Sequence, residues 1–172
     1  MGVRYRVRQF TIALGANINR ETTKALREYL AASQLELFRS MSSIDQHHGW
    51  AVFRTLREAQ EAEASLLRAA LLHDVGKTIG PVRIWHRVIA VLARALAPRF
   101  WEMIDGNSGT WRYPFYVHRH HAALGAELAR EAGCSPEAVW LIAHHEDHRG
   151  ETDSADGKNG LLVALQAADE LN

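Results

Sequence analysis

The chain has 172 residues, of which 47% are hydrophobic and 23% are charged, proportions that are ordinary for one globular domain with a full core. Its 20 lysines and arginines balance its 20 aspartates and glutamates, so no general basic field points to a nucleic-acid partner. The balance does not exclude a small phosphorylated substrate, because a few arginines near the site are enough to bind one.

Two features bear on where the protein works. Cys134 is the single cysteine, which excludes an internal disulfide and favours a reducing, cytoplasmic location. The longest apolar stretch, residues 84–101, is interrupted by His86 and by three arginines. A bilayer-spanning helix tolerates such residues poorly, so we predict an amphipathic helix here and no transmembrane segment.

Apolar residues at helical spacing predict helices in the first half of the chain over residues 21–37, about 45–62, 64–72 and 83–96. The third of these helices stops at His73 and Asp74, and we expect Gly76 to adopt the C-cap conformation that ends it. Residues 1–42 are expected to form a helical extension packed on the domain of residues 43–172.

Helices continue through the second half, where they are predicted over residues 117–131, 136–145 and 161–171. Residues 105–110 are polar and glycine-containing, and predict a loop closed by Pro114. Ser135 is suited to cap the helix that opens with Pro136. Because no alternating strand pattern is found, the predicted fold is an all-α bundle.

The distinctive feature of the sequence is a set of polar residues on apolar helix faces. His73 shares a face with core-forming leucines and alanines, and Asp74 follows it directly. An aspartate in apolar surroundings is costly unless it is paired or binds a cation. Similar positions on other predicted helices are held by His48, His121, His144, His145 and Asp169.

Any one of these histidines could be a core residue hydrogen-bonded to a carbonyl, and Asp169 alone could lie on a frayed terminus. Together they are typical of helical bundles that direct ligands from several helices to one metal site. Adjacent histidines leave a choice: the spacing to Val52 favours His48 over His47, and the spacing to Gly125 favours His121 over its neighbour.

The order His48, His73-Asp74, Asp169 resembles the H…HD…D signature of the HD superfamily of metal-dependent phosphohydrolases. The text around these residues is similar to the HD-x-G-K, HPxxGAELL and HHE elements of its HDIG and HD-GYP groups, at residues 73–77, 121–128 and 144–146. The resemblance implies an HD-domain helical bundle with a metal site at its centre.

By this resemblance, a first divalent metal would be held by His48, His73, Asp74 and Asp169, and a second by Asp74, His121, His144 and, as a further candidate, His145. Such ligands suit Fe, Mn, Ni, Co or Zn, and two ions would activate a water for attack on a phosphoryl group. Lys77 becomes a candidate catalytic contact to phosphate beside Asp74, although a solvated lysine at a helix end would look the same. The implied substrate is a nucleotide or another small phosphorylated molecule, cleaved as a phosphomonoester or a phosphodiester.

The chain departs from these groups in several places. No GYP motif follows Glu146, which argues against cyclic dinucleotide hydrolysis. Ala122 replaces the proline of HPxxG, and Ile44 stands where a glutamate would support a third metal. Two other functions stay open, namely a di-iron oxygenase similar to inositol oxygenase and a non-catalytic HD signalling module.

Overall fold

The computed structural model describes residues 20–61, 63–80, 86, 106–147 and 158–172. In this part of the chain every regular element is helical, which confirms the all-α prediction. The α-helices are α2 (Arg20–Tyr29), α3 (Ala32–Ser40), α4 (Ser43–Glu58), α5 (Ala64–Leu72), α8 (Tyr113–Glu131), α9 (Pro136–His144) and α10 (Lys158–Leu171), with a 3₁₀ helix, η1 (Val75–Ile79), after α5.

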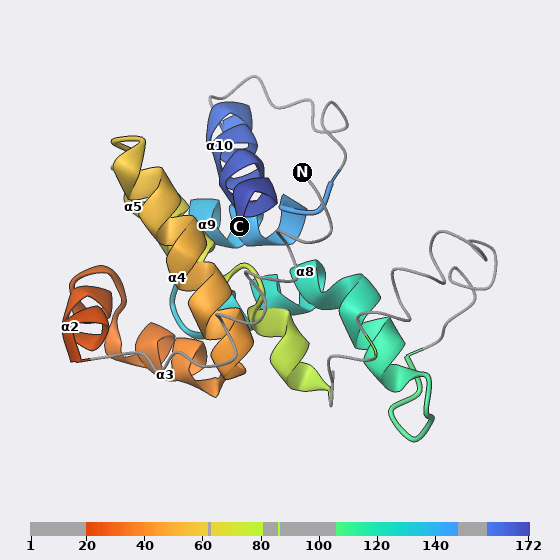
Figure 1. Ribbon diagram of the computed structural model, residues 1–172. Coiled ribbons are helices and arrows are strands. Elements are labelled where there is room, and N and C mark those ends of the chain that lie inside the picture. Colours follow the sequence, from red (N-terminus) through yellow and green to blue (C-terminus); the bar gives the residue numbers. More distant parts are fainter. Residues whose placement is uncertain (1–19, 62, 81–85, 87–105, 148–157) are drawn as a thin grey trace, which may run out of the picture.

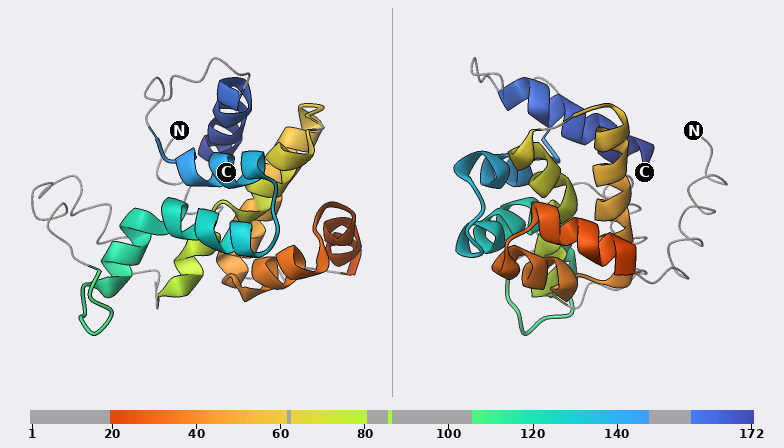
Figure 2. Two further views of the ribbon diagram at one scale, coloured as in Figure 1. Left: turned by 180° about the vertical axis from the view of Figure 1, so that it is seen from behind. Right: turned by 90° about the vertical axis from the view of Figure 1, so that its left-hand side faces the viewer.

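Helix α5 packs against α2, α3, α4, α9 and α10, and Figure 1 shows the arrangement of the helices. The side chains of α5 are buried at nearly every position, as expected for a helix whose only polar residues are Ser65 and Arg68. Helices α4 and α9 flank α5, and α10 packs against all three. Helix α8 packs on α9 and η1, and extends away from the centre at its N-terminal end (Figure 2).

Helices α2 and α3 share the hydrophobic core of the rest of the bundle. Leu26, Leu35 and Phe38 belong to the same buried cluster as the leucines of α5. The boundary expected near residue 42 stays a prediction. Among the described residues, no helix is long and apolar enough to cross a membrane.

Some predicted helices match the structure closely and others begin or end elsewhere. Helix α5 has the predicted bounds, and Ser135 caps α9 by accepting a hydrogen bond from the Ala138 amide at 3.2 Å. Helix α4 ends at Glu58, earlier than predicted, because Gln60 adopts a left-handed conformation (φ 64°). The helix predicted over residues 83–96 lies outside the described residues except for His86, which is helical.

The helix predicted over residues 21–37 is wrong, because the structure has two helices there. Ala31 is extended, and its amide donates to Oε1 of Gln34 at 3.1 Å, so that a new helix begins at Ala32. The predicted start of the helix at residue 117 is also wrong. Helix α8 begins at Tyr113 with Pro114 in its first turn, where a missing N–H costs nothing.

The prediction for Gly76 is wrong as well. Gly76 does not provide a left-handed C-cap, since it lies inside η1 and is absent from the described residues with positive φ. A Cβ at this position would lie 2.0 Å from the carbonyl oxygen of His121. Glycine is needed here because the backbones of η1 and α8 touch.

Candidate metal centre

Three buried histidines near the bundle centre use the same hydrogen bond to orient their rings. Nδ1 of His73, His121 and His145 donates to the carbonyl oxygen three residues earlier, at 2.9, 2.8 and 2.8 Å respectively. A carbonyl only accepts, so Nδ1 carries a proton in each of the three rings, and Nε2 is the ring nitrogen that faces the cluster. A histidine held in this way is prepared to ligate a metal through Nε2.

The first group of possible ligands joins three helical segments. His48 on α4, His73 at the end of α5 and Asp169 on α10 place their ligand atoms within 4.8 Å of one another. Oδ1 of Asp169 lies 2.7 Å from Nε2 of His48 and 3.5 Å from Nε2 of His73. We call these three residues triad 1.

A second group lies directly beside it. Asp74, His121 and His145 also place their ligand atoms within 4.8 Å of one another, and all three are buried. Oδ1 of Asp74 lies 3.2 Å from Nε2 of His121. We call these three residues triad 2.

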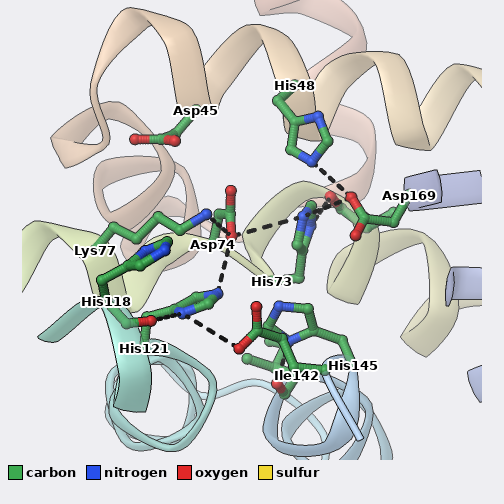
Figure 3. Close-up of polar contacts among 12 residues, drawn as sticks. Asp45, His48, His73, Asp74, Lys77, His118, His121, Ile142, His145 and Asp169 are labelled. Carbon is green, nitrogen blue, oxygen red and sulfur yellow. Dashed lines mark hydrogen bonds and ion pairs between the residues drawn. The ribbon is translucent and has the colours of Figure 1, made fainter. Parts of the chain in front are cut away.

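The two triads form one continuous cluster (Figure 3). The ring centroids of His48 and His73 lie 5.1 Å apart, those of His73 and His145 5.0 Å, and those of His145 and His121 5.1 Å. Nε2 of His73 is also 3.9 Å from Oδ1 of Asp74. The adjacent pair His73-Asp74 therefore contributes one ligand to each triad.

Lys77 brings a positive charge to the same place. Its Nζ lies 2.5 Å from Oδ1 of Asp74, and its side chain is only 13% exposed. The 3₁₀ geometry of η1 folds Lys77 back over Asp74, since the Lys77 amide donates to the Asp74 carbonyl at 3.0 Å. A largely covered ammonium group thus faces triad 2 from one side.

The protonation of the cluster follows from its charges. Burial alone would lower the pKa of His73, but the carboxylates of Asp74 and Asp169 outweigh it and raise that pKa to about 9. Burial, aided by the charges of His73 and His121, lowers the pKa of His145 to about 3. Against the cost of burial, Lys77 and His73 hold the pKa of Asp74 well below its usual value.

Asp169 is likewise kept ionised. Burial acts to raise its pKa, but hydrogen bonds from His48 and His73 outweigh burial and lower that pKa below its usual range. The cluster thus offers ionised carboxylates next to imidazoles, and a metal has to displace the proton of His73.

The structure does not bring every candidate residue into the cluster. Nδ1 of His144 instead lies 2.5 Å from Oδ2 of Asp147, and its ring packs on Trp140. His145, treated from the sequence as a further candidate, takes the place that His144 had in the predicted ligand set. The adjacent residues diverge because neighbouring side chains point about 100° apart around a helix, and His145, the C-cap of α9, still has helical backbone angles.

The other adjacent histidines also separate. Nδ1 of His47 lies 2.7 Å from the Ser43 carbonyl oxygen on its own helix, whereas His48 reaches Asp169. The ring of His120 packs on Tyr116, with centroids 4.4 Å apart, whereas His121 reaches Asp74. In both places the structure brings to the cluster the histidine that the spacing favoured.

One residue at the edge of the cluster was not predicted. Oε2 of Glu146 lies 3.8 Å from Nδ1 of His121, and its side chain is 46% exposed. The HHE element contains this glutamate, so the motif was a signal that could have identified it.

The donor set is suited to divalent transition metals. Each triad combines imidazole nitrogens with one carboxylate, ligands typical of Fe, Mn, Co, Ni and Zn sites. Three protein ligands leave coordination positions for water and substrate, as catalytic metal sites require. We conclude that the described residues can hold one or two such ions.

Comparison with known proteins agrees with this geometry. The profile of the HD domain family matches residues 35–171. Ribonuclease Y of Geobacter metallireducens is 33% identical over 106 residues, which are 61% of this chain and 12% of that protein. Ribonuclease Y of Geobacter sulfurreducens is 32% identical and that of Geotalea uraniireducens is 31% identical, each over 106 residues that are again 61% of this chain and 12% of the relative. No solved structure matches the chain significantly.

The chain thus corresponds to about an eighth of the length of these ribonucleases and shares a module with them. The likeness to the HDIG and HD-GYP groups in particular stays a prediction.

Proposed function

The chain belongs to the HD domain family, and from this membership and the geometry of the cluster we propose that it is a metal-dependent phosphohydrolase. The observation that carries the proposal is the contact between the two triads through His73-Asp74, with Lys77 beside them. Two adjacent metal positions and one nearby cation form an arrangement suited to a phosphoryl group.

In this proposal triad 1 holds one ion and triad 2 holds the second. Bound divalent ions supply Lewis acidity toward phosphoryl oxygens and lower the pKa of an attacking water. The carbonyl bonds to Nδ1 keep the three buried imidazoles aimed at the ions. Lys77 neutralises charge on the phosphoryl group, and the ion pair between its Nζ and Oδ1 of Asp74 keeps the ammonium in place.

The substrate class is a phosphoester in a nucleotide or another small phosphorylated molecule. The relatives are named as ribonucleases, which favours a phosphodiester over a phosphomonoester. The equal numbers of acidic and basic residues favour a small substrate or a short oligonucleotide over a long nucleic acid.

The proposal is tested by metal analysis of protein purified without oxygen, followed by a panel of phosphoesters. The panel contains a nucleoside monophosphate, a cyclic nucleotide, a cyclic dinucleotide and a short RNA. We expect metal in the wild type and hydrolysis of at least one phosphodiester. Asp74→Ala should lose both metal and activity while its circular dichroism stays helical, and retained turnover in this variant would refute the proposal.

A second variant separates metal binding from catalysis. Lys77→Ala should keep its metal and lose rate by about 10²–10³-fold, the usual cost of a lost charge-stabilising group. Unchanged kinetics would remove Lys77 from the mechanism. Two bound irons and consumption of dioxygen without phosphoester hydrolysis would support the oxygenase, and an intact fold that binds no metal would support the signalling module.

A further inference from the structure

Gln166 is a buried polar residue on the inner side of α10. Only 8% of it is exposed. Its Nε2 donates to the carbonyl oxygens of His145 at 3.2 Å and of Asp147 at 2.9 Å. Both N–H groups of the amide are therefore used, one on each carbonyl.

These carbonyls belong to the turn that presents His145 to triad 2. Helix α9 ends at His144, and carbonyls beyond a helix end have no helical partner. The same turn is closed by a hydrogen bond from the Asp147 amide to the His144 carbonyl at 3.0 Å. Gln166 thus fastens this turn to α10 through both hydrogen bonds.

Helix α10 also carries a ligand of triad 1. Asp169 lies three residues after Gln166, so the two side chains lie on neighbouring positions of the same helix face. A shift of α10 that moves Asp169 relative to His48 therefore moves the support of His145 too. One helix bears on both metal positions.

We propose that Gln166 is a positioning residue that holds His145 in place for triad 2 and ties its geometry to that of triad 1. The inference rests on the proposed metal centre, but not on which substrate is cleaved. Groups that orient a ligand without touching the metal commonly change metal affinity by about 10–100-fold when they are removed.

A purely structural role would produce a different result, and Gln34 provides the matched control. Gln34 is also a buried glutamine, 4% exposed, and its Nε2 donates to a backbone carbonyl, that of Gly133, at 3.2 Å. It lies on α3 and is not part of either triad. Gln34→Met and Gln166→Met each remove a buried amide at nearly constant volume.

The test is a titration of chelator-treated, full-length protein with Co²⁺, followed by visible absorption and calorimetry. We expect two binding steps in the wild type. Gln166→Met should weaken one step by about tenfold or more, whereas Gln34→Met should leave both steps unchanged even if it lowers the melting temperature equally. Gln166→Glu, which has no amide N–H, should weaken the same step and serves if the methionine variant does not fold.

The affected step is identified by combining substitutions. His145→Ala removes the ligand that Gln166 supports, so adding Gln166→Met to His145→Ala should cause no further loss of affinity. Wild-type affinity in both Gln166 variants, or equal losses in Gln166→Met and Gln34→Met, would overturn the inference, as would a wild type that binds a single equivalent. A protein that binds two Co²⁺ ions but cleaves no phosphoester would refute the proposed function alone, since the titration still decides the role of Gln166.

Discussion

Nε2 of His48 lies 2.7 Å from Oδ1 of Asp169, although 121 positions separate the two residues in the chain. The contact exists because α10 packs against α4. Directly after the end of α10, Nδ2 of Asn172 donates to Oγ1 of Thr55 at 2.9 Å, two turns further along α4 than His48. Triad 1 therefore depends on the packing of two helices rather than on one local motif.

The adjacent pair His47 and His48 gives a direct test of triad 1. His48→Gln removes a ligand and should lower the affinity for the first metal by about tenfold or more. His47→Gln is the matched control, because Nδ1 of His47 lies against the Ser43 carbonyl oxygen of its own helix and His47 belongs to neither triad. Metal content after dialysis measures both, and equal losses in the two variants would contradict triad 1.

A second adjacent pair tests triad 2. His145→Ala should weaken binding of the second metal, since the ring of His145 lies between those of His73 and His121. His144→Ala should retain both metals, because His144 pairs with Asp147 away from the cluster. Calorimetric titration with Mn²⁺ distinguishes the two variants, and the reverse result would restore His144 as the ligand.

Gly76 should tolerate no side chain. A Cβ there would lie 2.0 Å from the His121 carbonyl oxygen and 2.6 Å from the Gly125 amide nitrogen, both backbone atoms that cannot turn aside. We expect Gly76→Ala to lower the free energy of unfolding by about 3 kcal/mol or more, the upper end of overpacking costs. Because Asp74 and His121 lie on either side of this contact, binding at triad 2 should weaken as well.

Gly160 is the matched control for this substitution. It lies in α10 with nothing within 4 Å of an added Cβ, so Gly160→Ala should leave stability unchanged or raise it by up to about 1 kcal/mol. Chemical denaturation followed by tryptophan fluorescence measures both variants. Similar stability of the two would show that η1 and α8 can separate at little cost.

The stability of chelator-treated protein should peak near pH 6.5. His73 has a raised pKa of about 9, so its contribution is complete below its unfolded pKa of 6.5 and is lost as the pH rises toward 9. His145 has a lowered pKa of about 3. As the pH falls from 6.5 to 3, the unfolded chain therefore binds a proton at His145 that the folded chain does not bind, and the free energy of unfolding decreases. The lowered pKa of Asp169 adds a further loss below its usual value of 3.8.

Melting temperatures between pH 4 and pH 9.5 would test this profile, with His145→Gln as the informative variant. Without the imidazole at position 145, the decline on the acid side should become shallower while the decline on the alkaline side remains. A stability that rises steadily across the whole range would contradict the assigned protonation of the cluster.

Much of the fold could be predicted because its signals are local. Helix α5 has the predicted bounds because a run that is apolar except for Ser65 and Arg68 is followed by the polar pair His73-Asp74. Ser135 caps α9 because its hydroxyl accepts a hydrogen bond from a first-turn amide. The break at Ala31 could not be predicted from helical spacing. It depends on the side chain of Gln34, which is buried and hydrogen-bonded by tertiary contacts.

The sequence by itself determined that imidazoles and carboxylates occupy core-facing positions on several helices, since burial and helical periodicity can be read from residue types in order. Only the tertiary structure decided that these groups divide into two triads sharing His73-Asp74, and that His145 rather than His144 joins them. The physical reason is that neighbouring residues on a helix point about 100° apart. Which of two neighbouring side chains points to the metal centre depends on where each helix ends and on how closely its backbone approaches the next helix. At Gly76 the lack of a Cβ allows the backbone to approach that of His121.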